Sequence, residues 1–427
     1  MRKMKNSGVP WIGQIPVAWK VCPLKTSIKW KSEKNHADAM VLSLYRDYGI
    51  VPKDSRDDNF NVTSLDTSGY KYVEVGDLVI NKMKAWQGSI AVSDYEGIVS
   101  PAYHVCQITN ESVFKRYLHY LLRNSSYLPE YMRLSTGLRI GQWDLGFDDF
   151  KNIPIILPDI DEQKRIVAFL DTECTRIDAV IEQTRTSIEE YKKLKQSVIT
   201  QAVTKGIRPN RKMKDSGIEW IGEIAEEYNV YKLKYVLRQQ LQYGANQSGV
   251  PYDELLPRYI RITDITLDGR LKNTGALSLV EEDAQDYILQ NNDVLFARSG
   301  ATVGKAFIYK SEYGRAAFAG YLIRASLKDD LLPDLLFYYT QSSIYDEWKK
   351  QIFIQATIQN IGADRYRELP VILQPIMEQR EIVSYLKSKC EEIDSLIDRK
   401  ESLLAELEGY KKSLIYEYVT GKKEVPA

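Results

Sequence analysis

The sequence predicts a tandem duplication: two mixed α/β modules that differ from each other, held in a frame of two long helices that are alike. One observation is that "KMKNSGVPWIG" at Lys3 returns as "KMKDSGIEWIG" at Lys212. A second is that "PIILPDIDEQKRIVAFLD" at Pro154 returns as "PVILQPIMEQREIVSYLK" at Pro370. A repeat with a period of about half the chain sets the architecture. We therefore expect a duplicated helical frame that holds two modules of different sequence.

The repeats divide the chain into four parts. We expect a first module over residues 1–153, with the repeat segment 3–25, and a first long helix over 154–208. A second module should span 209–369, with the repeat segment 212–234, and a second long helix 370–427. Between the repeats the two modules share little beyond Asp77 with Asp293 and Gly146 with Gly362. Each module is therefore expected to carry its own site.

The modules read as mixed α/β. Short alternating apolar segments broken by Gly and Asp, as in "YKYVEVGDLVINKMKAWQGSIAV" and "YILQNNDVLFARSGATVGKAFIYK", predict hairpins. Helical stretches follow in "ESVFKRYLHYLLRN" and "LLPDLLFYYTQSSIYDEWKK". Each module closes with a polar, glycine-containing loop. These loops and the hairpin loops gather Arg, Lys, Gln, Asn and aromatic residues, the types that contact DNA bases and phosphates, although most polar loops are only solvated.

The long helices carry a heptad seam with 4-3 spacing. Asp159 predicts the first cap, and Gly206 and Gly421 predict the ends, so that each helix spans about 45 residues. A homodimeric coiled coil is one interpretation. Because both seams belong to one chain, we favour antiparallel intramolecular pairing with a pseudo-twofold axis. The principal seam residues are Leu170, Ile177, Ile181 and Ile188 in the first helix and Leu386, Ile393, Ile397 and Leu404 in the second.

The amino-acid composition limits the classes of protein to which this chain can belong. The chain has 427 residues, 44% apolar and 27% charged, with a formal net charge of zero. These values are typical of globular proteins and give no support to a nucleic-acid partner by themselves. No window reaches the roughly 20 apolar residues of a membrane span, and the N-terminus lacks a signal peptide core, so we expect an intracellular protein. The four scattered cysteines fit neither a disulfide framework nor a zinc site.

None of the candidate catalytic motifs in the sequence matches the pattern of a known catalytic site. "PDIDEQK" from Pro158 resembles a nuclease pattern, but it opens a helix and its repeat loses the first carboxylate, which favours capping. "GATVGKA" from Gly300 lacks the spacing and the Ser or Thr of a phosphate-binding loop. The three histidines form no metal-spaced or triad pattern, and no adenine methyltransferase motif is present. We expect no chemistry from this chain itself, and no bound metal or cofactor.

The repeated segments "SGVPWIGQIPVAWKVCPLK" and "SGIEWIGEIAEEYNVYKLK", together with the two helix starts, resemble the specificity subunit of type I restriction-modification systems. The resemblance covers the whole chain. It implies two target recognition domains that each read half of a split double-stranded DNA target, separated by antiparallel conserved helices. It also implies two methyltransferase subunits and ATP-driven restriction subunits as partners, with S-adenosylmethionine, ATP and magnesium on those partners, in a prokaryotic cytoplasm.

On this resemblance we assign DNA contact to the loops already identified. The candidates are Lys82, Lys84, Trp86, Gln87, Arg139, Gln142 and Trp143 in the first module, and Arg298, Ser299, Lys305, Gln355, Thr357, Gln359, Asn360 and Arg365 in the second. Two other hypotheses stay open. A single-chain enzyme would need catalytic motifs, and a structural coiled-coil adaptor would not explain two divergent α/β modules.

Overall fold

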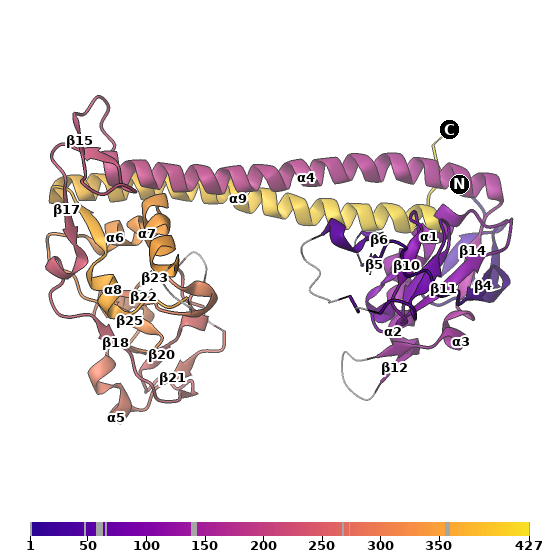
Figure 1. The fold of residues 1–427 in the computed structure, drawn as a ribbon, viewed down its shortest axis with the longest axis horizontal. Helices are drawn as coiled ribbons and strands as arrows, with labels where there is room; N and C mark the ends of the chain where they lie inside the picture. Colours follow the sequence, from indigo (N-terminus) through magenta and orange to yellow (C-terminus); the bar gives the residue numbers. More distant parts are fainter. Residues whose placement is uncertain are drawn as a thin grey trace. The chain divides into compact units, whose positions relative to one another are not determined.

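The computed structural model describes residues 2–46, 48–56, 63–64, 66–137, 143–266, 269–272, 274–354 and 359–426. The chain divides into two compact units, the first formed by Met1–Arg185 with Ser402–Ala427 and the second by Thr186–Glu401. The boundary between the units falls within both long helices, α4 (Ile160–Lys205) and α9 (Ile376–Val419) (Figure 1). Each unit therefore contains a part of each helix. The four-part division expected from the repeats, which separates the modules from the long helices, differs from this division into units and stays a prediction.

The first unit is built around an antiparallel four-stranded sheet in the order β4-β11-β8-β9, with α1 and α2 packed beside it (Figure 1). Its main strands are β4 (Ile28–Lys31), β8 (Leu78–Asn81), β9 (Ile90–Val92) and β11 (Tyr103–Ile108). Two-stranded ladders surround the sheet: β1 (Met4–Asn6) with β2 (Gln14–Pro16), β3 (Lys20–Pro23) with β14 (Pro154–Leu157), β5 (Leu42–Tyr45) with β6 (Gly49–Pro52), β7 (Lys71–Val73) with β10 (Gly97–Val99), and β12 (Ser135–Thr136) with β13 (Asp144–Leu145). The short helices are α1 (Lys115–Arg123), α2 (Leu128–Leu134) and α3 (Phe147–Phe150).

The second unit repeats this plan and adds a second sheet. The four-stranded sheet β18-β25-β22-β23 consists of β18 (Gln242–Tyr243), β25 (Leu322–Ala325), β22 (Val294–Ala297) and β23 (Ala306–Ile308). The added sheet consists of β19 (Val250–Pro251), β21 (Leu277–Ser278), β20 (Arg258–Ile260) and β24 (Ala316–Phe318), the last pair parallel. The remaining elements are β15 (Met213–Asp215) with β16 (Glu223–Ala225), β17 (Asn229–Lys232) with β26 (Pro370–Leu373), and the helices α5 (Glu281–Ala284), α6 (Pro333–Tyr339), α7 (Ser343–Ile354) and α8 (Ala363–Arg367).

The long helices begin and end where the sequence predicts. Asp159 accepts a hydrogen bond from the Glu162 N–H at 2.8 Å, which caps α4. Gly206 and Gly421 follow the two helix ends with φ of 75° and 70°, the left-handed conformation that favours glycine. The eight principal seam residues lie on the inner face, seven of them buried and Leu404 half-buried. The two predicted long helices are confirmed.

Within each unit the helix segments run antiparallel. In the first unit Lys411 contacts Asp178 at 2.6 Å and Arg185 contacts Glu408 at 3.0 Å. In the second unit Lys195, the polar interruption of the seam, lies 2.7 Å from Asp394, and the Gln374 amide, just before α9, donates to the Val203 carbonyl at 2.7 Å. Increasing numbers on α4 therefore meet decreasing numbers on α9 in both units.

The first turn of each long helix fixes the adjoining module through a buried glutamine. The Gln163 amide donates to the carbonyls of Pro158 and Ser112, both at 2.9 Å, and its oxygen accepts from the Phe114 N–H at 2.8 Å. Gln379 makes the same three bonds in the second unit, to Gln374, Asp330 and Leu332, at 2.7 to 2.9 Å. Both side chains are fully buried. The "EQ" of the repeated motif therefore joins helix to module.

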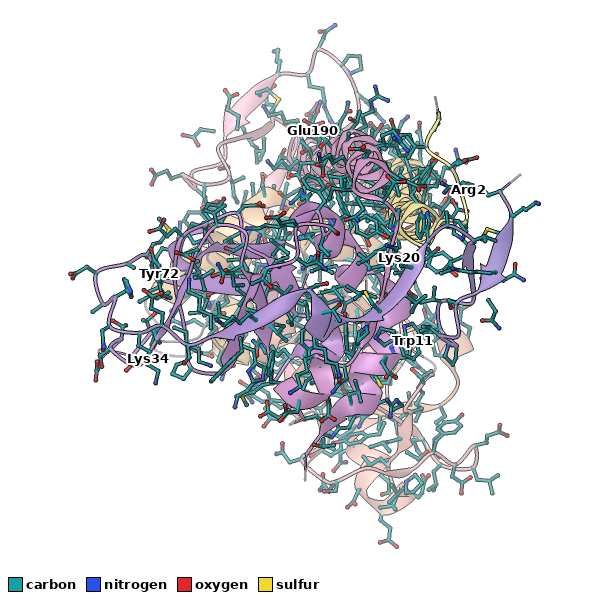
Figure 2. All side chains as sticks on the ribbon, turned by 90° about the vertical axis from the view of Figure 1, so that its right-hand side faces the viewer. Arg2, Trp11, Lys20, Lys34, Tyr72 and Glu190 are labelled. Carbon is teal, nitrogen blue, oxygen red and sulfur yellow. The ribbon has the colours of Figure 1, made fainter. Side chains whose placement is uncertain are left out.

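The preceding glutamate fixes the N-terminal repeat segment to the same helix. Glu162 pairs with Arg2 and accepts from the Trp19 indole N–H at 3.1 Å; Figure 2 labels Arg2 and, at the start of β3, Lys20. In the second unit Glu378 pairs with Arg211 and accepts from the Tyr228 hydroxyl at 2.6 Å. Burial alone would raise the pKa of Glu378, but these hydrogen bonds outweigh burial and hold the pKa below its usual value.

Candidate nucleic-acid interface

The first candidate site lies on the loop between β8 and β9. Lys82 follows β8 directly, and its N–H donates to the Ala102 carbonyl at 3.2 Å. Its own carbonyl accepts from the Leu145 N–H at 3.0 Å, which ties the hairpin loop to β13 in the closing loop. The chain then turns through a short 3₁₀ segment, Ala85–Gln87, that ends at Gly88 with a φ of 90°. The structure thus brings together two loops that are about 60 residues apart in sequence.

Three of the predicted side chains lie on these two loops, and the two tryptophans among them contact each other. Lys82 Nζ lies 3.3 Å from an Asp144 oxygen, and both groups stay partly exposed. The Trp86 and Trp143 rings contact edge to face, with centroids 5.2 Å apart, and the Trp86 indole N–H donates to the Met83 carbonyl at 3.1 Å. An aromatic pair beside a cation offers both a stacking surface and a hydrogen-bond donor.

The other first-module candidates are placed less closely. Lys84 and Gln87 are exposed on the same loop. Arg139 and Gln142 lie outside the described residues. Sequence reasoning missed Lys71, whose pKa is lowered by burial and by the nearby charges of Lys82 and Lys34. Lys71 is itself buried, and its ammonium donates to the Tyr103 carbonyl.

The second candidate site lies on the equivalent loop, between β22 and β23. The Arg298 N–H donates to the Tyr321 carbonyl at 3.0 Å, and the Arg298 carbonyl accepts from the Ile361 N–H at 2.9 Å. Ser299, half-buried, forms a β-bridge with Asn360 in the closing loop. Lys305 is half-buried at the far end of the loop, where its carbonyl accepts from the Ala297 N–H at 2.8 Å.

Side chains from two other segments contact Arg298. The guanidinium carbon lies 4.8 Å from the centre of the Tyr243 ring, and Nε contacts the Asn360 amide oxygen at 3.4 Å. The Tyr243 hydroxyl in turn accepts from the Ala363 N–H at 2.9 Å. Gln359 is exposed beside Asn360, whereas Gln355 and Thr357 lie outside the described residues. Sequence reasoning missed Tyr243, because nothing in its local sequence indicates a stacked arginine.

Lys82 and Arg298 occupy the same position in the two modules. Each is the fifth residue after the buried aspartate that directly precedes the matching strand, Asp77 before β8 or Asp293 before β22. Their two backbone hydrogen bonds are the same, and the donors Leu145 and Ile361 directly precede the matched glycines of the closing loops. The two modules therefore present one equivalent site each, with different side chains.

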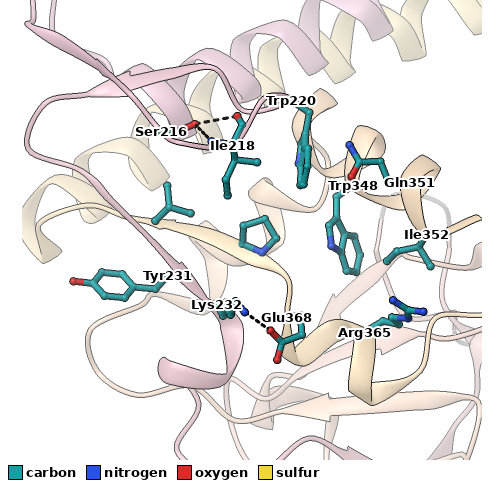
Figure 3. Close-up of a pocket in the computed structure, with 12 residues that line it drawn as sticks. Ser216, Ile218, Trp220, Tyr231, Lys232, Trp348, Gln351, Ile352, Arg365 and Glu368 are labelled. Carbon is teal, nitrogen blue, oxygen red and sulfur yellow. Dashed lines mark hydrogen bonds and ion pairs between the residues drawn. The ribbon is translucent and has the colours of Figure 1, made fainter.

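Arg365 faces a cavity of about 480 Å³ in the second unit, where the repeat segment meets α7 (Figure 3). The indoles of Trp220 and Trp348 form part of its apolar wall, and Lys232 pairs with Glu368 at 2.6 Å on its rim. Arg365 itself lies 3.9 Å from its neighbour Asp364. The structure therefore places Arg365 at this cavity, on α8, whereas Asn360 and Arg298 meet at the loop.

Neither a metal centre nor a membrane helix can be assigned within the described ranges. The described His, Cys, Asp and Glu side chains form no cluster suited to a metal ion, and the four cysteines are free. Among the described helices, none combines the length and the apolar character of a membrane span.

Comparison with known proteins gives consistent matches. The family model of the type I restriction modification DNA specificity domain matches residues 25–190 and 258–408. The MjaVIII type I restriction enzyme specificity subunit of Methanocaldococcus jannaschii is 25% identical over 83% of this chain and 83% of its own length. The EcoKI specificity subunit of Escherichia coli K12 is 23% identical over 73% of this chain and 66% of its own.

A solved structure from work on complex assembly and conformational transition of the type I R-M system covers 96% of this chain and 99% of its own, with a TM-score of 0.71 and 16% identity. That likeness concerns the fold. The family model matches the chain twice and covers well over half of it, one match in each half. The chain therefore belongs to the type I restriction modification DNA specificity family, as a non-catalytic specificity subunit with two DNA recognition domains.

Proposed function

We propose that this chain reads a split DNA target, with one module for each half-site, and that it holds the catalytic subunits of a type I system on that target. The supporting observation is the equivalent loop pair in the two modules, centred on Lys82 and Arg298. A duplicated scaffold that presents different side chains at the same position suits two half-sites of different sequence. Bipartite targets on duplex DNA require two readers at a fixed spacing.

The side chains at the two sites suit base reading. Lysine and arginine donate to guanine, asparagine and glutamine pair with adenine, and exposed lysines contact phosphates. The first module offers Lys82, Lys84 and Gln87 beside two tryptophans, and the second offers Arg298 with Gln359 and Asn360. With zero net charge, the chain would contribute sequence selection while partner subunits share the phosphate contacts.

The long helices would set the distance between the readers. Helix α4 has 46 residues and α9 has 44, which corresponds to about 65–70 Å of helix at ~1.5 Å per residue. In this proposal an antiparallel coiled coil relates the modules by a pseudo-twofold axis, and its length determines the spacer of the target.

Partner docking would use the outer face of the helices. Val180 and Leu194 on α4, and Leu403 and Tyr410 on α9, are exposed apolar side chains at heptad positions next to the seam. Apolar side chains exposed along a helix offer contact area to a protein partner. We propose two methyltransferase subunits on this frame, with restriction subunits joining them. S-adenosylmethionine, ATP and magnesium would bind to those partners, and no cofactor to this chain.

The test is single-molecule methylome sequencing of a host that expresses this chain with its cognate methyltransferase subunit, against a strain without this chain. We expect adenine methylation at one split motif that disappears with the chain. If the complex is assembled and supplied with S-adenosylmethionine but methylates no motif, the reading function is refuted and the adaptor hypothesis is favoured. If the chain supports cleavage or methylation with no partner present, the single-chain enzyme hypothesis replaces it.

A further inference from the structure

We propose that Arg298 reads a guanine in the half-site of the second module. This inference rests on the proposed function and goes further by naming the base and the atoms that would recognise it. Guanine presents two acceptors, O6 and N7, in the major groove, and a bidentate arginine is the commonest specific contact to them. The structure holds Arg298 in a way that favours this contact over others.

The backbone of Arg298 is fixed on both sides. Its N–H donates to Tyr321 in the sheet, and its carbonyl accepts from Ile361 in the closing loop. The next residue, Ser299, bridges to Asn360. The Cα of Arg298 is therefore held at the junction of two loops, which is the condition for a side chain to act as a positioned reader.

The guanidinium is fixed as well. Its central carbon lies over the Tyr243 ring, 4.8 Å from the ring centre, and Nε contacts the Asn360 oxygen at 3.4 Å. Tyr243 is itself held through its hydroxyl and through pairing of its strand with Ile323. A stacked and tethered arginine loses little further side-chain entropy when it binds.

These contacts leave the outer edge of the guanidinium for a ligand. Nη1 and Nη2 have no hydrogen-bond or ion-pair partner among the residues that the structure describes. They form the fork whose two parallel N–H groups match O6 and N7 of guanine. By contrast, Lys82 at the equivalent position is a point charge that already contacts Asp144. The equivalent site of the first module therefore has a different recognition chemistry.

Two other roles would use the same fork. Contact with a phosphate would strengthen binding to every sequence equally. A purely structural tie between the loops would matter for folding and not for the base. Both predict that a substitution at Arg298 leaves the preference at every base pair unchanged, so the change in base discrimination separates them from guanine reading.

The experiment uses the complex of this chain with its methyltransferase subunits and duplexes that carry each of the four bases at every half-site position. Wild type should prefer guanine at one position of one half-site. Arg298→Lys keeps the charge and removes the fork, so that preference should fall by about 5- to 150-fold, the range expected for one bidentate contact. Arg298→Gln should shift the preference at that position toward adenine, because glutamine pairs with adenine N6 and N7.

Arg315→Ala is the matched control, since Arg315 is an exposed arginine of the same unit paired with Glu281. This variant should keep the guanine preference. If Arg298→Lys retains wild-type discrimination at every position, or weakens all sequences equally, the guanine assignment is wrong while the split-target function stands. If wild type itself methylates no split motif, the proposed function fails first.

Discussion

Lowering the pH from 7 to 5 should destabilise the first unit through His119, a half-buried histidine. His119 lies in α1, and its Nδ1 accepts the Val92 N–H at 3.3 Å. Burial lowers the pKa of His119 to about 3, with smaller contributions from Arg123 and Arg116. The folded state therefore holds the neutral ring.

The sign follows from linkage. Because the folded pKa lies below the unfolded value of about 6.5, the unfolded chain binds the extra proton and stability falls as the pH drops below that value. Between pH 7 and pH 5 the loss from this one group is about 2 kcal/mol, since protonation of the unfolded histidine becomes more than tenfold favourable while the folded ring stays neutral.

The assay compares wild type with His119→Gln, which keeps an acceptor for the Val92 N–H but does not titrate. Amide exchange over β9 and α1, corrected for the intrinsic pH dependence, reports the opening free energy of the first unit. Wild type should lose about 2 kcal/mol more than the variant between the two pH values. The second unit contains no histidine and serves as an internal reference. Parallel pH curves for wild type and variant would refute the reasoning.

Three further predictions concern the frame. Gln379→Leu removes three buried hydrogen bonds and should destabilise the second unit by about 3 kcal/mol. The control Gln201→Leu, at an exposed position of α4, should change the opening free energy of that unit by less than about 0.5 kcal/mol. If hydrogen exchange shows equal effects for the two variants, Gln379 does not join the helix to its module. Glu378→Gln removes the buried carboxylate that pairs with the half-buried Arg211 and leaves that arginine with its second ion-pair partner, Glu227, at 3.3 Å. It should cost about 2 kcal/mol, visible as a lower Tm, and an unchanged Tm would show that the ion pair contributes nothing. Inserting one heptad after Tyr191 and one before Lys400 should lengthen the spacer of the methylated motif by about three base pairs; a folded double insertion with the original spacer would exclude the helices as its determinant.

The sequence predicts the long helices well, because heptad spacing, an aspartate cap and glycine stops are local signals. The hairpins are also recognisable from alternation. The function of the "EQ" motif was not predictable, because a charged and a polar residue in the first turn of a helix are typical of solvent-exposed capping. Glu162 and Gln163 instead reach partners such as Trp19 and Ser112, which requires the tertiary fold.

The loops that carry the candidate sites could be predicted from the sequence, but the contacts between those loops could not. Composition indicates which loops carry cations, amides and indoles. The equivalence of Lys82 and Arg298 rests on backbone hydrogen bonds to distant segments. Backbone hydrogen bonds do not depend on the side chain, so the sequences of the two modules, which hardly match, do not reveal them. The stacking of Arg298 on Tyr243 joins residues 55 positions apart, and Arg365, predicted beside it, lies at a separate cavity.

The discontinuity of the first unit has a consequence for biosynthesis. The second unit is one continuous stretch, Thr186–Glu401, so all of its residues are made before residues 402–427. The first unit needs residues 402–427, where the Val419 carbonyl accepts from the buried Tyr117 hydroxyl at 3.0 Å. The module translated first therefore cannot complete its native contacts until the last helix segment has been made. A released chain truncated before Ser402 should accordingly hold a protease-resistant second unit and a first unit that is still open to cleavage.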